Sequence, residues 1–339
     1  MNIRSNIYVL MILWVGMSLS ACAGLPGETG LPPVEADRDH GQEVVKQVTA
    51  QIGIVKEARI TDYLNAVGQR LGQAHYDQRF EYVFQVLDQP QSNAFAVSGG
   101  HVFVSRGLLA LANNEDELAN VMGHEIIHVS RRHSARQMAK QKVPNLLTLP
   151  GRMVGSVVGE GIGNMINAPI NTLGATYLAK HSREDEFEAD RLGQKLSAQA
   201  GYDPQALATF LVRLQKESQL HSGEQRGPGF FDTHPTTPDR VARLTGDAQK
   251  IKWTRQPGVV GDPAAFLYQM DGLMLGENPA MGVLQGHKFL QPALDFSIAF
   301  PSDWKAVNTF EAVVAFTPKK DAVLLLSIFG KGKDPGQAG

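Results

Sequence analysis

The sequence predicts an α+β protein: a mainly helical domain with a small β-sheet, followed by a small C-terminal β-rich domain. Helices are predicted because apolar residues such as Val44, Val48 and Ile52 recur at helical spacing through residues 41–75. Residues 80–87 instead alternate and are rich in aromatic and β-branched side chains, which is typical of a strand. Beyond about Trp253 the chain changes character and carries several short strand-like segments, which indicates a second domain.

The remaining elements follow from local signals. Asn114 is a good N-cap, with Glu117 three residues later in a capping box, and Pro144 limits the helix that they begin. We expect this helix to run from 114 to about 142. Further helices are expected at residues 181–200, 203–219, 237–244 and 266–275, and further strands at 93–97, 101–104, 294–300, 312–316 and 323–329.

Two segments near the end of that helix have more than one interpretation. Its basic residues are expected to compensate the helix dipole and face solvent, with contact to anionic lipid as the alternative. They are Arg131, Arg132, Arg136, Lys140 and Lys142. Residues 143–179 are glycine-rich and apolar, and asparagines interrupt them. We expect a flap or helical hairpin there, and a segment resting on a membrane is the alternative.

Composition excludes two broad classes of protein. The chain has 32 Lys and Arg against 34 Asp and Glu, a net charge of -2, so it lacks the basic balance of a nucleic-acid-binding domain. A hydrophobic fraction of 43% with 19% charged residues excludes wholesale disorder. The 339 residues are enough for about two domains. We place the main domain at residues 41–252 and a C-terminal β-rich region at 253–339, with an incomplete domain as one interpretation of that region.

The first 21 residues have the pattern of a secretory signal peptide. Arg4 provides a positive start, and the apolar residues 7–19 are fewer than the ~20 that a membrane-spanning helix needs. Small residues then lead to Cys22, the chain's single cysteine, which resembles a bacterial lipobox and predicts lipidation at Cys22. A plain signal peptide with a stray cysteine is the alternative.

The resemblance to a lipobox also predicts a location. Ala23 stands where an aspartate would favour retention in the inner membrane, so the periplasmic side of the outer membrane is expected. The acyl chains on Cys22 would anchor the protein to that membrane. Residues 22–40 contain several prolines and glycines without periodicity and are predicted to form a flexible tether.

His124, Glu125 and His128 form the strongest chemical signal in the chain. Residues i and i+4 lie on one face of a helix, so both imidazoles can project toward one metal ion. Glu125 lies beside that face, where a general base for a zinc-activated water is needed. Because a zinc ion in a catalytic site usually has three protein ligands, one ligand remains to be found.

The third ligand is not another nearby histidine. In the longer pattern H-E-x-x-H-x-x-G-x-x-H, Arg131 replaces the glycine and Ser134 replaces the last histidine. The acidic run at 184–190 is the next candidate. On that helix Glu186 and Asp190 share a face with the small residues Ala189 and Gly193, which permit close approach to the first helix.

Spacing favours Glu186 as the third ligand, with Glu188 and Glu160 as rivals. Asp190, one turn further on, is predicted to accept a hydrogen bond from the second nitrogen of a ligand histidine.

The motif H-E-x-x-H followed by a distant E-x-x-A-D resembles the zinc metallopeptidase family that includes HtpX and the CAAX prenyl protease. The soluble, lipid-anchored or periplasmic branch typified by BepA is the most similar. The resemblance covers about residues 42–244 and includes Asn93-Ala94-Phe95-Ala96, Gly99-Gly100, Thr233-His234-Pro235 and Arg240. It implies a zincin-like fold with one zinc ion per chain and Glu186 as the third ligand. The C-terminal third departs from that branch, because it has no tetratricopeptide repeats.

Substrate-binding and regulatory roles are predicted for further residues. An exposed strand edge formed by Gly99, Gly100, His101 and Val102 is expected to hold an extended peptide, and an internal hairpin is the alternative. His234 has three interpretations: a buried structural histidine, a residue that masks the open metal position, or one that stabilises the oxyanion. Asp190, His234 and Arg240 are grouped as supporting or regulatory residues.

These features predict a zinc-dependent metalloendopeptidase tethered to the bacterial cell envelope. His124, His128 and Glu186 would hold the metal, and Glu125 would transfer protons. The family and the compartment imply unfolded or misassembled envelope proteins as substrates. A zinc-containing periplasmic chaperone or outer-membrane assembly factor with a latent site is the alternative, although a structural zinc ion has no need of Glu125.

Overall fold

The structure, a computed structural model, describes residues 30–140, 181–220, 229–235, 238–308, 312–319 and 321–327. The helices are α1 Val34–Ile52, α2 Ala58–Ala74, α3 Arg106–Leu111, α4 Glu115–Ser130, α5 His133–Lys140, α9 Arg183–Gln199, α10 Ala206–Leu220, α11 Phe230–Thr233, α12 Pro238–Ala248 and α13 Pro263–Gln269. The strands are β1 Val83–Leu87, β2 Ala94–Val97, β3 His101–Ser105, β4 Val283–Gln285, β5 Lys288–Gln291, β6 Phe296–Ala299, β7 Lys305–Asn308, β8 Ala312–Phe316 and β9 Val323–Ser327. The predicted signal peptide, Cys22, Glu160 and the segment 143–179 lie outside the described residues.

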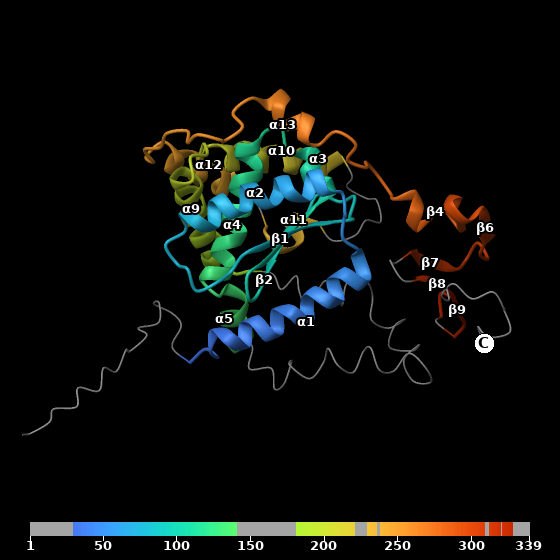
Figure 1. The fold of residues 1–339 in the computed structure, drawn as a ribbon. Coiled ribbons are helices and arrows are strands. Elements are labelled where there is room, and N and C mark those ends of the chain that lie inside the picture. Colours follow the sequence, from blue (N-terminus) through green and yellow to red (C-terminus); the bar gives the residue numbers. More distant parts are fainter. Residues whose placement is uncertain are drawn as a thin grey trace, which may run out of the picture.

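A three-stranded sheet lies between α1 and the helices α2, α4, α9 and α10 of the main domain (Figure 1). Strand β3 is central and pairs parallel with β1 and antiparallel with β2. Because side chains alternate across a strand, Phe95 and Phe103 pack with Val44 of α1 on one face. Ala94 and Val102 face the larger core on the other side, which α2, α4, α9 and α10 also line. The prediction of an α+β fold is confirmed.

The pairing of α4 with α9 brings the two predicted metal-binding segments together. A Cβ atom placed on Gly193 of α9 would lie 3.0 Å from the Cα atom of His124 on α4. Ala189, one turn earlier on α9, is fully buried in the same core. The small side chains therefore allow the close helix approach that the sequence predicts.

The N-terminal boundary of the folded domain differs from the prediction. Helix α1 begins at Val34, so residues 34–40 are helical and not part of a flexible tether. Asp37 in this stretch is buried, and its Oδ2 atom lies 2.6 Å from Nε of Arg132. The partner that orders this stretch is nearly a hundred residues away in sequence, so no local pattern reveals it.

The predicted single helix over 114–142 is also wrong, because it is divided into α4 and α5. The break falls at Arg132, whose φ of 53° lies in the left-handed region that non-glycine residues rarely adopt. The ion pair with Asp37 holds Arg132 there. The cap is as predicted on one side, since the Asn114 side chain accepts from the Glu117 amide. The Glu117 carboxylate accepts from the Asn113 amide instead of closing the box on Asn114.

Three of the basic residues that were expected to face solvent, Arg131, Arg132 and Arg136, form ion pairs instead, while Lys142 and the side chain of Lys140 lie outside the described residues. Arg131 lies 2.7 Å from Glu188, and Arg136 lies 3.0 Å from Asp185, so both pair with the acidic start of α9. Arg132 is buried against Asp37. Arg131 and Arg136 thus connect their segment to α9, whose carboxylates lie beside them because α9 packs against α4. The sequence of their own segment does not indicate these partners.

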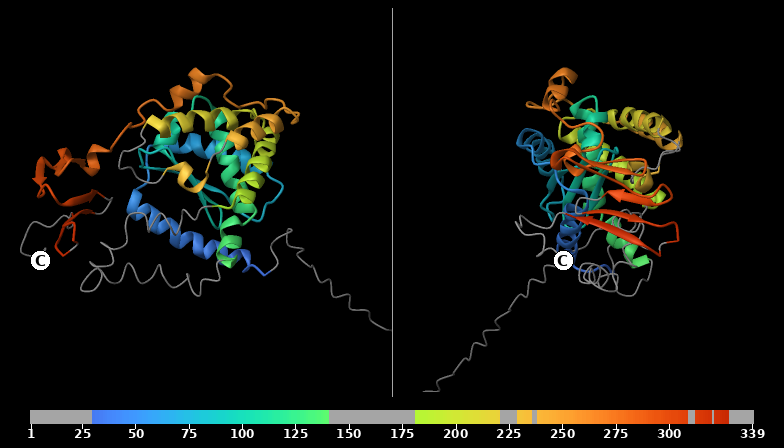
Figure 2. Two further views of the ribbon diagram at one scale, coloured as in Figure 1. Left: turned by 180° about the vertical axis from the view of Figure 1, so that it is seen from behind. Right: turned by 90° about the vertical axis from the view of Figure 1, so that its right-hand side faces the viewer.

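The C-terminal region is β-rich, as predicted. It contains two three-stranded antiparallel sheets, in the orders β4-β5-β6 and β7-β8-β9, around a core that includes Phe289 and Phe300. Figure 2 shows this unit beside the helical body, to which a linking segment connects it. Arg106 donates to the carbonyls of Met274 and Gly276 and so fixes that segment. In the part of the chain that the structure describes, no helix is both long enough and apolar enough to cross a bilayer.

Candidate metal centre

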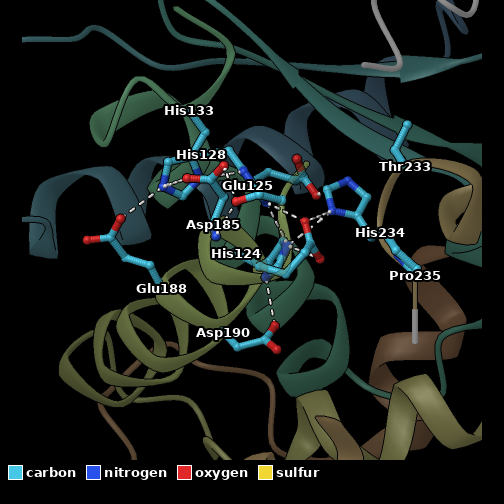
Figure 3. Close-up of polar contacts among 12 residues, drawn as sticks. His124, Glu125, His128, His133, Asp185, Glu188, Asp190, Thr233, His234 and Pro235 are labelled. Carbon is cyan, nitrogen blue, oxygen red and sulfur yellow. Dashed lines mark hydrogen bonds and ion pairs between the residues drawn. The ribbon is translucent and has the colours of Figure 1, made fainter. Parts of the chain in front are cut away.

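Helix α4 presents its three motif residues to the interior of the protein. His124 and Glu125 are fully buried, and His128 is 3% exposed. Figure 3 shows them turned toward residues of α9 and toward His234, which follows α11. Buried polar groups are costly unless they find partners, so this arrangement indicates a functional site.

Four ligating side chains converge at this point: His124, His128, Glu186 and His234. We call them the metal-site cluster; their ligating atoms all lie within 4.8 Å of one another. The Nε2 atoms of His124 and His128 are 2.9 Å apart, and Oε1 of Glu186 lies 3.3 Å from the latter. The Nδ1 atom of His234 is 2.9 Å from Glu186 and 3.2 Å from Nε2 of His124.

The chemistry of this cluster fits a zinc ion. Zinc favours four ligands from imidazole and carboxylate groups, and tetrahedral ligands at ~2.1 Å lie roughly 3.4 Å from one another. The separations within the metal-site cluster are close to that value. Two imidazole nitrogens at 2.9 Å share at most one proton between them, so their lone pairs suit a common cation.

Glu125 lies beside the cluster without joining it. Neither of its carboxylate oxygens makes a hydrogen bond of normal geometry within the described residues, although both are buried. The Nε2 atom of His234 lies 3.4 Å from its Oε1 atom. Burial raises the pKa of the Glu125 carboxyl, which makes it a better proton acceptor than an exposed glutamate.

The electrostatics of the other members suit metal binding. Burial lowers the pKa of His128 well below its ordinary value, which keeps the imidazole neutral and its lone pair available. Burial alone would raise the pKa of Glu186, but the neighbouring imidazoles of His234 and His128 hold it well below its usual range. The cluster therefore offers a neutral imidazole at His128 and an ionised carboxylate at Glu186.

Asp190 and Arg240 support the cluster from behind. Oδ1 of Asp190 lies 3.0 Å from Nδ1 of His124, the nitrogen on the side away from the cluster. The Nε and Nη2 atoms of Arg240 donate to the two carboxylate oxygens of Asp190, at 2.7 and 2.8 Å. Its Nη1 atom is 2.9 Å from Oε2 of Glu186. The same Nη1 atom donates to the carbonyl of His234. Arg240 thus connects three of the residues that surround the predicted metal position.

The prediction of a substrate-binding edge at Gly99, Gly100, His101 and Val102 is wrong. His101 and Val102 belong to β3, which β1 and β2 cover on both sides. The two glycines have φ of +88° and +111°, and Cβ atoms there would meet the backbone of Arg38 and Glu81. They serve a tight turn between packed elements. The edge strand beside α4 is β2.

Sequence reasoning missed the part that His133 and Glu188 take. Glu188 was predicted as a rival metal ligand, and no role was predicted for His133. His133 is fully buried, and its Nδ1 atom lies 2.8 Å from Nδ1 of His128. Glu188 points to His133, Arg131 and Arg136 instead of the metal-site cluster. The signal in the sequence was the position of His133, five residues after His128. In the continuous helix that was predicted, however, His133 would point away from His128.

The close approach of α4 and α9 leads to a prediction for Gly193→Ala. Alanine is ordinarily the better helix former by ~0.5–1 kcal/mol. At Gly193 the added methyl group would press on the His124 backbone, so we expect the free energy of unfolding to fall by about 1–3 kcal/mol and metal affinity to weaken. Gly246→Ala in α12 is the control, because no atom lies within 4 Å of its Cβ position; thermal melts should show a gain there. Equal stabilisation by both changes would contradict the close packing.

The fold and the site define a class. A helix that carries H-E-x-x-H, with a glutamate from a second helix beside it, is the arrangement of metal-dependent peptidases of the zincin type. Comparison with known proteins agrees: the model of peptidase family M48 matches residues 56–248. The chain belongs to peptidase family M48 and is therefore classed with the metallopeptidases.

The relatives in other organisms include bacterial and mitochondrial proteins. The beta-barrel assembly-enhancing protease of Escherichia coli (strain K12) is 31% identical over 215 residues, 62% of this chain and 44% of that protein. Its Yersinia pestis counterpart is 31% identical over 223 residues, 65% of this chain and 45% of that protein. The mitochondrial metalloendopeptidase OMA1 of Schizosaccharomyces pombe is 27% identical over 215 residues, 62% of this chain and 60% of that protein. The chain thus spans less than half the length of the first two relatives.

Proposed function

We propose that this protein is a zinc-dependent metalloendopeptidase that cleaves unfolded or misassembled proteins of the cell envelope. The observation that carries the proposal is the metal-site cluster next to Glu125, a buried carboxylate without a hydrogen bond of normal geometry. A purely structural metal site has no use for such a costly group. The intact Glu125 therefore favours an enzyme over an assembly factor with a latent site.

Each residue of the site has its own proposed role in peptide hydrolysis. His124, His128 and Glu186 would hold the zinc ion, which supplies Lewis acidity that polarises the scissile carbonyl and acidifies water. Glu125 takes a proton from the attacking water and later delivers it to the leaving amine. Asp190 and Arg240 keep His124 and Glu186 in place.

The substrates and the location are proposed from the names of relatives and from the start of the chain. Two bacterial relatives carry the name beta-barrel assembly-enhancing protease, which favours envelope proteins as substrates. The lipobox-like sequence at Cys22 favours a lipoprotein on the periplasmic side of the outer membrane. Membrane fractionation of cells that express Cys22→Ser tests the anchor, because a variant that still sediments with the outer membrane would contradict it.

Removal of the metal should abolish the activity reversibly. We expect the mature chain, purified in detergent, to contain one zinc ion and to cleave casein, a protein without stable structure. Dialysis against a chelator should reduce cleavage to background, and stoichiometric zinc should restore it. Zinc content is measured by atomic absorption and cleavage by gel electrophoresis. Cleavage that survives complete loss of zinc would refute the proposal.

His234 is proposed to mask the metal, because its Nδ1 atom lies among the ligating atoms of the metal-site cluster, 2.9 Å from Glu186. We expect His234→Ala to cleave casein several-fold faster than the wild type, since it frees one position near the metal. The measurement is the initial rate at equal zinc content. A large loss of activity would instead support a role in stabilising the oxyanion. Zinc binding without cleavage in either protein would favour the assembly factor.

A further inference from the structure

His128 has a partner on the side away from the metal-site cluster. Its Nε2 atom faces His124 and Glu186, while its Nδ1 atom lies 2.8 Å from Nδ1 of His133. The Nε2 atom of His133 is in turn 3.1 Å from Oε2 of Glu188. Figure 3 shows the three groups one after another, with Glu188 farthest from the cluster. They form an imidazole–imidazole–carboxylate relay.

If His128 binds a metal through Nε2, only one arrangement of protons satisfies every hydrogen bond along this relay. If Nε2 of His128 is to offer a lone pair to a metal, its proton must be on Nδ1, which then donates to Nδ1 of His133. His133 must then carry its own proton on Nε2, which donates to Glu188. An ionised Glu188 accepts that hydrogen bond, so every group along the relay is satisfied.

Two arginines keep the outer end of the relay charged. Arg131 lies 2.7 Å from Oε1 of Glu188, and Arg136 lies 3.0 Å from its Oε2 atom. His133, Asp185 and Glu188 are close enough to suggest a second cation site. That reading fails because Nη2 of Arg136 already lies 3.0 Å from each of the two carboxylates. The guanidinium group supplies the positive charge that a metal would bring.

The break between α4 and α5 makes the relay possible. In a continuous helix, residue i+5 lies about 140° around the axis from residue i, so His133 would point away from His128. The left-handed conformation of Arg132 breaks the helix and turns His133 toward the His128 ring. The unusual backbone conformation at Arg132 therefore has a function at the site.

The two metal-site histidines of α4 are supported in parallel ways. His124 contacts Asp190, which the guanidinium group of Arg240 holds. His128 reaches the arginine-paired Glu188 through His133. Partners of this kind fix the ring and the tautomer of a metal-binding histidine, and their loss typically weakens metal affinity by roughly 10–100-fold.

We propose that His133 is a positioning residue, which with Glu188 holds His128 with its Nε2 lone pair directed toward the metal. The inference rests on the proposed function, because it takes His128 as a metal ligand. It goes beyond that function by assigning a role to two residues outside the metal-site cluster.

The test compares zinc affinity among five proteins: the wild type, His133→Leu, His133→Asn, Glu188→Gln and Glu184→Gln. Affinity is measured on the mature chain in detergent by competition with a zinc-chelating dye. Leucine removes the acceptor at similar volume, whereas the asparagine amide oxygen can replace Nδ1 of the imidazole. Glu184 is exposed on the same helix as Glu188, so Glu184→Gln is the control for loss of a charge.

We expect His133→Leu to bind zinc about 10–100-fold more weakly and His133→Asn to recover affinity to within about threefold of the wild type. Glu188→Gln should fall between them, and Glu184→Gln should match the wild type. The cobalt(II)-substituted His133→Leu protein should also show an altered visible spectrum, because His128 is no longer held in one orientation.

Unchanged zinc affinity in a folded His133→Leu protein would overturn the inference, as would equal losses in the leucine and asparagine variants. If His133→Leu does not fold, Glu188→Gln decides, and wild-type affinity there overturns it. A wild-type protein that binds no zinc would overturn the proposed function itself, so the two failures are distinguishable.

Discussion

Replacement of Glu125 by glutamine is expected to abolish casein cleavage and leave zinc binding intact. General acid–base catalysis typically contributes about 10²–10⁴-fold, and an amide cannot accept the proton of the attacking water. Glu125 is next to His124 on α4 but outside the metal-site cluster, so the ligands remain in place. Initial rates and zinc content, measured on the same preparation, check this prediction.

The same substitution should not destabilise the protein. Burial raises the pKa of Glu125 and makes its charged form costly, whereas glutamine has no charge to bury. We therefore expect the melting temperature of the metal-free Glu125→Gln protein to equal or exceed that of the wild type. Glu184→Gln, an exposed change, is the matched control for activity. Persistent cleavage by a zinc-loaded Glu125→Gln protein would show that another group is the base.

Arg240→Leu is expected to have the largest effect on stability. Arg240 is 2% exposed and balances Glu186 and Asp190, both of which are buried. Removing one partner of a buried ion pair typically costs about 3–5 kcal/mol, because a charge remains without compensation. At roughly 2–4 °C per kcal/mol for a domain of this size, the melting temperature should fall by about 6–20 °C.

Two further variants separate the effect of Arg240 from a general effect of losing a charge. Arg240→Lys keeps the charge but lacks the planar fork that contacts both oxygens of Asp190, so partial recovery is expected. Arg243→Met is the control. Arg243 lies on the same helix but is exposed, and its guanidinium group stacks on the Phe187 ring. Its loss should cost no more than about 1 kcal/mol. Similar melting temperatures for Arg240→Leu and Arg243→Met would contradict the role given to Arg240.

Local patterns were sufficient for the main components of the site. The spacing of His124 and His128 places both on one face of a helix in any fold, because that geometry belongs to the helix itself. The same holds for Glu186 and Asp190, four residues apart on α9. Ala189 and Gly193 indicated close helix packing because only small side chains permit it. These predictions needed no knowledge of the neighbouring elements.

Predictions that depended on neighbours were the ones that failed. The strand after Gly100 was read correctly as a strand, yet its place at the centre of the sheet depends on β1 and β2 lying on both sides. Arg131 and Arg136 are ordinary surface residues in their own segment and become ion-paired only because α9 lies beside them.

Local sequence patterns predict the kind of chemistry, whereas the supports around the site depend on contacts between distant segments. Residue types at helical spacing predict a metal-binding pair and a base, since the helix converts sequence separation into distance. The contact of Asp37 with Arg132 joins segments far apart in the chain, and it orders residues 34–40 and breaks the long helix. That break returns His133 to His128. Such long-range contacts form only when the whole core packs, so they cannot be predicted from a local sequence pattern.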